Sequence, residues 1–254
     1  MARVVITTLD DGVPIASETP RTAGETTAIL GDDRPIQLRR RRLPADAGLR
    51  MTAASTSRLL FVWSGSVVVN DETFTQDAAI VVEQGAACDL QAGEAGCELL
   101  EFQSPGLASE RKGGHVHALR RERAPSAELA YGGGCLLADG DCPTCEVWLH
   151  MNELKPNFLG ARHCHDQHEV IVCTGGTLQF GTRTLRRGGV LAVDKEAYYT
   201  FNSGDDGASF INYRPAPSMI IFAGKKGRSP PREESLKAAC GRPTLSASSV
   251  WSAA

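Results

Sequence analysis

Aromatic residues are scarce in this sequence, and long apolar segments are missing. Phe, Trp and Tyr make up 6% of its 254 residues, and no apolar run has the length that a transmembrane helix requires. The apolar stretch at the N-terminus is too short for a signal peptide and soon turns acidic. We therefore expect a cytoplasmic protein that does not bind membranes.

Neither sign of charge dominates the composition. The 27 Lys and Arg residues are balanced by 30 Asp and Glu residues, which gives a net charge of −3. Nucleic-acid-binding proteins normally carry a basic field, so we expect no nucleic-acid partner. The one basic run, Arg39 to Arg42, is interpreted as the solvated flank of a loop or strand.

Short runs typical of β-strands occupy most of the chain, and helical periodicity is weak. Groups of β-branched and aromatic residues are interrupted by Gly, Asp and Asn. Examples are Leu59–Trp63, Ser66–Val69, Ala79–Val82, His168–Cys173, Val190–Val193 and Ser209–Tyr213. Many short strands at regular spacing predict an all-β sandwich or barrel.

The two halves of the chain share an order of elements. Phe61–Val69 parallels Ile171–Phe180, and Asp77–Cys88 parallels Gly189–Tyr199. A repeat of roughly a hundred residues predicts two copies of one barrel. We place the first barrel at 1–110, a linker at 111–138, a second barrel at 139–225 and a polar tail at 226–254.

The densest group of candidate metal ligands lies in the second half. His163 and His165 are two residues apart, so both point to one side of a strand and Cys164 points away. A tight turn can bring Glu169 beside them, whereas its neighbour His168 then faces the other side. Two imidazoles and a carboxylate on one side of a metal form the facial triad of non-haem iron sites. They also suit zinc, manganese, nickel or copper.

The spacing His163-x-His165-x3-Glu169-x6-Gly176, with Gly160 ahead of it, resembles the first motif of the cupin family. The resemblance implies that each half forms a jelly-roll, double-stranded β-helix barrel, so that the chain is a bicupin. It also implies one divalent metal ion per chain in the second barrel, with Fe(II) favoured. A small-molecule substrate and a monomer or homodimer are expected.

The second cupin motif departs from the family pattern at its metal ligand. Asp194 stands where the family has Pro, Glu196 where it has Gly, and Tyr199 where it has a fourth ligand, His. Tyr199 can coordinate as a phenolate, because a cation lowers the pKa of a phenol. Alternatively it stands back as a general acid or base, and positions on the metal remain open. A third interpretation is that loss of the His has abolished metal binding.

Alternation along the strands suggests which side chains line a substrate pocket. An inward Arg214 or Arg162 would favour an anionic substrate such as a carboxylic acid, because a guanidinium binds a carboxylate through paired hydrogen bonds. The other pocket candidates are Trp148, His150, Phe180 and Asn212.

The first half keeps the frame of the motif but none of its ligands. Counting back from Gly65 gives the counterparts of the ligand positions as Thr52, Ala54, Arg58 or Leu59, and Cys88. Thr and Ala cannot replace imidazole as ligands, and a single thiol is no metal site. We therefore expect the first barrel to be structural.

Two further groups of potential ligands are given no function. His115 and His117 lie among basic residues of the linker with no carboxylate at the required spacing, and we expect them to be exposed to solvent. Cys142 and Cys145 form a Cys-x-x-Cys pair, but a structural zinc site normally needs a second ligand pair in the sequence. We interpret them as a structural or surface pair.

We expect a metal-dependent enzyme that acts on a small organic molecule. Among cupin chemistries, oxygen-dependent cleavage or oxidation at Fe(II) ranks first because of the facial triad. Lyase, cyclase or isomerase chemistry, with Tyr199 and Glu169 at the reacting centre, is the alternative, and hydrolysis by a metal-bound hydroxide is the third. The rival from another class is a non-catalytic bicupin that only binds a small molecule. No helix-turn-helix pattern accompanies the barrels, which argues against a sensor.

Overall fold

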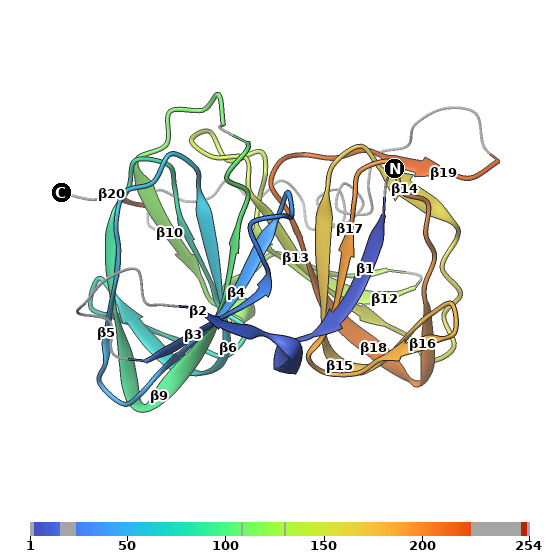
Figure 1. The fold of residues 1–254 in the computed structure, drawn as a ribbon, viewed down its shortest axis with the longest axis horizontal. Coiled ribbons are helices and arrows are strands. Elements are labelled where there is room, and N and C mark those ends of the chain that lie inside the picture. Colours follow the sequence, from blue (N-terminus) through green and yellow to red (C-terminus); the bar gives the residue numbers. More distant parts are fainter. Residues whose placement is uncertain (1–2, 16–23, 108, 130, 225–249, 253–254) are drawn as a thin grey trace. The chain divides into compact units, whose positions relative to one another are not determined.

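The computed structural model describes residues 3–15, 24–107, 109–129, 131–224 and 250–252. These residues form two all-β units, each a barrel of antiparallel strands, as predicted (Figure 1). Among the described residues, no helix combines the length and apolar character needed to cross a membrane.

The first unit, here called the N-barrel, comprises Asp11–Ala124 and Gly140–Val147, together with strand β20. Its antiparallel sheet has the order β2-β3-β4-β9-β6-β8-β10-β20, with β5 added to β9 and β7 to β6. The strands are β2 (Val13–Ile15), β3 (Glu25–Leu30), β4 (Gln37–Leu43), β5 (Gly48–Met51), β6 (Arg58–Val69), β7 (Glu72–Thr75), β8 (Ala79–Val82), β9 (Cys88–Gln103), β10 (His115–Leu119) and β20 (Val250–Ser252).

The second unit, the C-barrel, comprises the described residues up to Asp10, then Pro125–Asp139, and those from Trp148 to 224. Its main sheet has the order β1-β17-β15-β18-β13-β12-β11, with β16 added to β15, and β14 pairs with β19 in a small second sheet. The strands are β1 (Val4–Thr8), β11 (Ser126–Leu129), β12 (Gly132–Ala138), β13 (Trp148–Leu154), β14 (His163–His165), β15 (Glu169–Phe180), β16 (Arg183–Leu185), β17 (Gly189–Val193), β18 (Asn202–Arg214) and β19 (Ile220–Phe222).

The central strands of the two barrels correspond at a constant offset of 111 residues. Strand β6 begins at Arg58 and β15 at Glu169, and both are 12 residues long. Strands β4 and β13 have the same offset and are both seven residues long. The ladders agree as well, since Arg58 pairs with Val82 as Glu169 pairs with Val193. The offset therefore identifies which residue of one barrel replaces which residue of the other.

A glycine marks the same bend in β6 and β15. Gly65 and Gly176 have φ of 73° and 62°, in the left-handed region that side chains other than glycine rarely adopt. A Cβ added to Gly65 would lie 2.2 Å from the carbonyl oxygen of Gly96, and one added to Gly176 would lie 2.5 Å from that of Gly207. Both glycines are thus required by the close approach of the neighbouring strand, at a break in the ladder register.

The division of the chain differs from the predicted boundaries in three places. Strand β1 belongs to the C-barrel, where it pairs with β17. The predicted linker, 111–138, contains β10 of the N-barrel and β11 and β12 of the C-barrel. Gly140–Val147 connects β12 to β13 but belongs to the N-barrel. Short edge strands that pair far along the chain carry little periodicity, so the sequence pattern did not reveal these exchanges.

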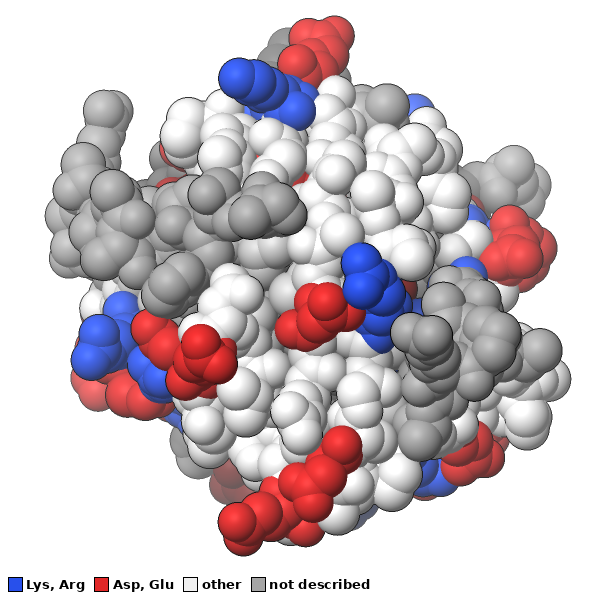
Figure 2. Space-filling model, turned by 90° about the vertical axis from the view of Figure 1, so that its left-hand side faces the viewer, with Lys and Arg blue, Asp and Glu red and all other residues white. Residues whose placement is uncertain are grey.

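The arginine run of β4 is not a solvated flank. Arg41 is buried and forms an ion pair with buried Glu101, and Arg40 pairs with Glu98 at 2.6 Å. Alternation along β4 directs Arg41 to the same side as Leu43, which lies in the core of the N-barrel. Elsewhere, acidic and basic side chains are interspersed over the face seen in Figure 2.

Candidate metal centre and pocket of the C-barrel

The two motif histidines and Tyr199 are brought together by backbone pairing. The N–H of His163 donates to the Tyr199 carbonyl at 2.9 Å, and the N–H of Tyr199 donates to the His163 carbonyl at 2.8 Å. Because directly paired residues point the same way, the two rings lie side by side with centroids 4.6 Å apart. The His165 ring is 5.2 Å from that of His163. Tyr199 thus lies beside the two motif histidines.

Glu169 is fully buried among polar partners at the start of β15. Its Oε2 accepts hydrogen bonds from Asn212 Nδ2 at 2.8 Å and Arg214 Nη2 at 2.9 Å, and it lies 3.9 Å from His165 Nε2. Burial alone would raise the pKa of this carboxyl, but the charges of His165 and Arg214 and hydrogen bonds from Tyr199 and Asn212 hold the pKa well below its usual value. Glu169 is therefore a carboxylate at neutral pH and can act as a ligand.

The second ring nitrogens of both histidines are occupied. His163 Nδ1 lies 2.7 Å from the Ala161 carbonyl, an acceptor, so Nδ1 carries a proton and Nε2 is the nitrogen that can face a metal. His165 Nδ1 lies 3.3 Å from the Ser218 hydroxyl, which also donates to Asp166 at 3.1 Å. Such contacts fix the orientation of metal-binding histidines.

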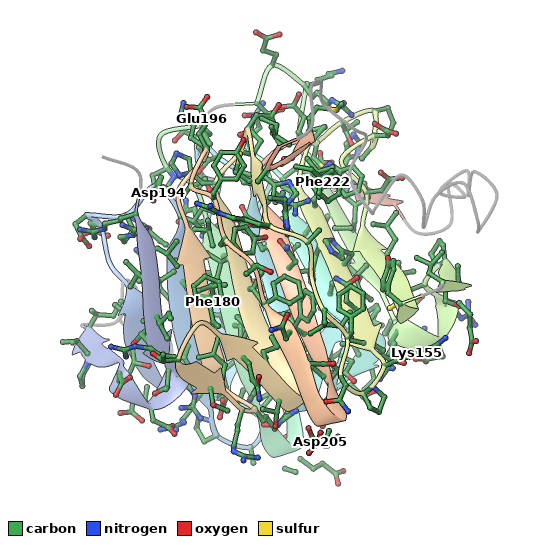
Figure 3. The ribbon with its side chains drawn as sticks, turned by 90° about the vertical axis from the view of Figure 1, so that its right-hand side faces the viewer. Lys155, Phe180, Asp194, Glu196, Asp205 and Phe222 are labelled. Atoms are coloured by element: carbon green, nitrogen blue, oxygen red, sulfur yellow. The ribbon has the colours of Figure 1, made fainter. Side chains whose placement is uncertain are left out.

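One cavity of about 340 Å³ opens beside these groups, a volume that includes solvent at its mouth. Its lining combines polar side chains, Tyr199 among them, with two phenylalanines and one aliphatic residue. The lining residues are His150, Asn152, His163, His165, Tyr199, Phe201, Phe210, Asn212, Arg214 and Ile220. Figure 3 shows Asp194, Glu196 and Phe222 toward one end of the C-barrel strands. Phe222 of β19 is paired with His163 of β14, so the motif histidines lie toward this end. Lys155 and Asp205 lie at the other end.

Three of the residues predicted for the pocket do not line the cavity. Arg162 is exposed, and its guanidinium lies over the Tyr198 ring at 5.5 Å. Trp148 is buried on the inner face but outside the cavity lining. Phe180 is partly buried outside the cavity lining, and its ring stacks on that of Tyr199 with centroids 6.0 Å apart. His150, Asn212 and Arg214 do line the cavity.

Other contributors could not be assigned to the site from the sequence. Phe201 and Phe210 lie on and beside β18, and a phenylalanine in a strand normally signals only a core position. Ile220 and Ser218 come from the segment after β18, where β19 returns to pair with β14. No sequence pattern indicated that return. Asn152 could have been chosen, since it shares a strand face with His150.

Two residues adopt glycine-like conformations around the motifs. Asn157, six residues before His163, has φ of 57°, and Glu196, at the position of the second-motif glycine, has φ of 65°. Asn tolerates this region, whereas Glu is strained there. The glycine conformation is thus retained even where the glycine is not.

The side chains around the cavity can be compared with the ligands that the implied divalent metal would need. Two buried imidazoles and a buried carboxylate are suitable ligands, and the Nδ1 contact of His163 leaves Nε2 as its ligand atom. Arg214 Nη2 lies 3.1 Å from His165 Nε2 and 2.9 Å from Glu169 Oε2, between two of the three donors. The residues fit the metal in type, and the guanidinium has to move aside for all three to coordinate.

The fold resembles that of several solved structures, although the sequences differ widely. Oxalate decarboxylase from Lactobacillus farciminis, in a formate complex, matches with a TM-score of 0.65 and 13% identity over 86% of this chain and 88% of its own. Protein Ylba from E. coli matches with a TM-score of 0.65 and 11% identity over 83% and 90% of the two chains. A protein from Nostoc punctiforme, provisionally described as a dioxygenase, matches with a TM-score of 0.67 and 13% identity over 99% and 87%.

These likenesses support the jelly-roll fold implied by the cupin resemblance, and at such identities they show the fold alone. No protein-family model and no curated protein sequence matches the chain.

Proposed function

We propose that the C-barrel is the active site of a metal-dependent enzyme that acts on a small organic acid, within a bicupin whose N-barrel lacks an equivalent interior site. One observation carries the proposal. His163, His165 and Tyr199 line one cavity together with Arg214, and Arg214 donates a hydrogen bond to Glu169. The cavity thus combines ligands for a cation with a side chain that binds anions.

His163, His165 and Glu169 would hold the metal, with Tyr199 as a fourth ligand or a neighbour. A bound divalent ion would supply Lewis acidity and, if it is Fe(II), the ability to react with oxygen. The protein supplies a buried site in which the two histidines are oriented through Ala161 and Ser218.

Arg214 accounts for the preference for an acid. In the structure its guanidinium neutralises Glu169. A cation held by Glu169 would take over that neutralisation, and Arg214 could then pair with a substrate carboxylate. Asn152 and Asn212 add amide groups that can orient the same molecule.

Oxygen-dependent oxidation at Fe(II) is the first reaction that we propose, because three protein ligands leave positions for both oxygen and a chelating acid. Lyase or isomerase chemistry is the second candidate. It is favoured by the position of Tyr199, whose buried hydroxyl hydrogen-bonds with Glu169 and lies beside the cavity, where it can exchange a proton with substrate.

The test is metal content together with oxygen uptake. We expect the wild-type chain to bind iron in the C-barrel and the His163→Ala/His165→Ala variant to lose it, with loss of oxygen uptake on small carboxylic acids. Thr52→Ala is the matched control, since Thr52 is the N-barrel counterpart of His163, and it should change neither. Equal binding of iron, zinc, manganese, nickel and copper by the wild type and by the His163→Ala/His165→Ala variant after reconstitution would contradict the proposal, because the C-barrel would then contribute no metal site.

A further inference from the structure

Four potential metal ligands from three separate segments meet on the N-barrel. Glu83 follows β8, His117 lies in β10, and Cys142 and Cys145 lie in the segment Gly140–Val147. One ligand atom from each residue lies within 4.8 Å of the other three. None of the four belongs to the site of the C-barrel. The group therefore needs its own explanation.

The register of β8 and β10 places Glu83 and His117 on one face. His117 is paired with Val81, and paired residues point to the same side, as do Val81 and Glu83 within one chain segment. Their neighbours Val82 and Val116 lie in the core of the N-barrel. The two ligands consequently lie on the outer face of the sheet. The His117 side chain is only 13% exposed there, so the prediction of solvent-exposed histidines was wrong for this residue.

The cysteine segment covers this face and is fixed by contacts of its own. The Gly113 N–H donates to the Thr144 carbonyl at 3.0 Å, and Arg111 Nη1 donates to the Cys145 carbonyl at 3.1 Å. Arg111 also pairs with Glu146 at 3.6 Å. Both thiols are buried, each 4% exposed. The backbone thus presents the two sulfur atoms to Glu83 and His117 without help from a ligand.

The distances are close to those of a tetrahedral zinc site. Cys142 Sγ lies 3.8 Å from His117 Nε2 and 4.0 Å from Glu83 Oε1. Zinc bonds of about 2.0–2.3 Å put ligand atoms roughly 3.3–3.8 Å apart. His117 Nε2 and Glu83 Oε1 are 2.5 Å apart and have to separate by roughly 0.8 Å to reach that geometry.

The orientation of the Glu83 carboxylate is already fixed. Its Oε2 accepts the backbone N–H of His115 at 2.9 Å, which leaves Oε1 facing the histidine and the sulfur atoms. The Thr144 hydroxyl donates to Oε1 at 2.5 Å and lies 3.3 Å from Cys142 Sγ. Hydrogen bonds of this kind support the ligands of metal sites from behind.

We propose that Glu83, His117, Cys142 and Cys145 bind one zinc ion as a closed, four-coordinate structural site. Two sulfurs, one imidazole nitrogen and one carboxylate oxygen form a donor set that zinc accepts, and four protein ligands leave no position for a substrate. The ion would fasten the segment Gly140–Val147 to β8 and β10. The site could not be recognised from the sequence, because its carboxylate and its histidine come from segments far from the cysteines and from each other.

The test uses cobalt as a spectroscopic substitute for zinc in the full-length chain. Metal-stripped, reduced protein is titrated with Co²⁺, and we expect the thiolate-to-cobalt charge-transfer band and the strong visible bands of tetrahedral cobalt at one ion per chain. The band should persist in His163→Ala/His165→Ala, so that the result does not depend on the C-barrel. It should be absent from Cys142→Ser/Cys145→Ser.

Zinc content provides the second measurement. In the His163→Ala/His165→Ala background we expect one zinc per chain, none after Cys142→Ser/Cys145→Ser is added, and no loss in the control Cys88→Ala/Cys97→Ala. Zinc should also raise the unfolding temperature only when both Cys142 and Cys145 are present. Reduced protein with intact cysteines that shows no thiolate band and retains no zinc overturns the proposal, as does zinc retention after loss of both cysteines.

Discussion

The two barrels share one frame and place different residues at the same points in it. At the offset of 111 residues, Arg58 stands where the C-barrel has Glu169, and Glu101 stands where it has Asn212. The carboxylate and the arginine of the C-barrel site thus have no counterparts of the same kind in the N-barrel, where Gln103 replaces Arg214.

Three interior polar side chains of the N-barrel bond to groups of the same barrel. Glu101 pairs with Arg41, Arg58 donates to the backbone carbonyl of Thr52, and Gln103 donates to Thr56 at 3.1 Å. In the C-barrel the corresponding end opens into a cavity lined by polar side chains. Under the proposed function, the same frame serves stability in one barrel and chemistry in the other.

Outside the sheets the contrast is reversed. Glu83 and Asp194 occupy equivalent positions after β8 and β17, and each accepts an N–H at the start of the neighbouring strand, from His115 of β10 at 2.9 Å and from Arg3, just before β1, at 3.0 Å. Only Glu83 is joined by a histidine and two cysteines. One carboxylate position thus has a backbone role in both barrels and an additional ligand role in one.

The largest effect is expected from breaking the interior ion pair of the N-barrel. Glu101→Gln leaves the Arg41 charge buried without its carboxylate, which typically costs about 3–5 kcal/mol in the free energy of unfolding. Calorimetry should show a lower unfolding temperature with turnover of the folded enzyme retained. Asp89→Asn, which affects a mostly exposed pair with Arg50, should stay within about 0.5 kcal/mol of the wild type. A variant as stable as the wild type would contradict a structural role for the N-barrel interior.

Exchanging Arg214 for its N-barrel counterpart tests the substrate side of the comparison. Arg214→Gln should weaken binding of small carboxylic acids about 10- to 100-fold, because it removes a charge-assisted pair worth about 1.5–3 kcal/mol. Titration calorimetry with the metal-loaded protein measures this. Arg162→Gln is the matched control, since Arg162 is exposed and outside the cavity, and it should leave affinity unchanged. Equal affinity in all three proteins would remove Arg214 from substrate binding.

The sequence was sufficient for the fold, and it grouped three residues of the candidate site that the structure brings together. Strand alternation places His163 and His165 together, and the motif spacing brings Tyr199 opposite His163. The first inference rests on local strand geometry, and the second rests on the resemblance to the cupin motifs. The all-β, two-barrel architecture follows from the same periodicity.

Contacts between distant segments could not be predicted in this way. Alternation could not choose between Arg162 and Arg214, and only Arg214 faces the cavity. In the sequence, Glu83, His117 and the two cysteines are far apart, although the fold brings their ligand atoms within 4.8 Å of one another. Pairing of β10 with β8, and return of the segment Gly140–Val147 to the N-barrel, depend on tertiary packing that no local pattern encodes.

A smaller effect is expected at the residue that replaces the fourth ligand. If the reaction is oxidation at Fe(II), Tyr199→Phe should lower turnover less than about tenfold, because Tyr199 then only orients Glu169. If Tyr199 transfers the proton, turnover should fall about 10²- to 10⁴-fold with metal content retained. Turnover against pH, measured with equal metal loading, separates the two. A large loss would therefore favour the lyase or isomerase chemistry over the oxidation that we rank first.

The smallest effect is expected at Asp194, and it isolates the extra role of its counterpart. Asp194→Asn weakens the hydrogen bond from the Arg3 N–H and the contact with His168, so the free energy of unfolding should fall by about 0.5–1 kcal/mol, with no change in bound zinc. Glu83→Gln weakens the equivalent bond from His115 and also removes a ligand, so zinc affinity should fall at least about tenfold. Zinc titration of both variants gives the difference directly. If the two variants show the same small decrease in the free energy of unfolding and bind zinc equally, the carboxylate serves in both barrels only as a hydrogen-bond acceptor for the neighbouring strand. The contrast between the barrels would then lie in their interiors alone.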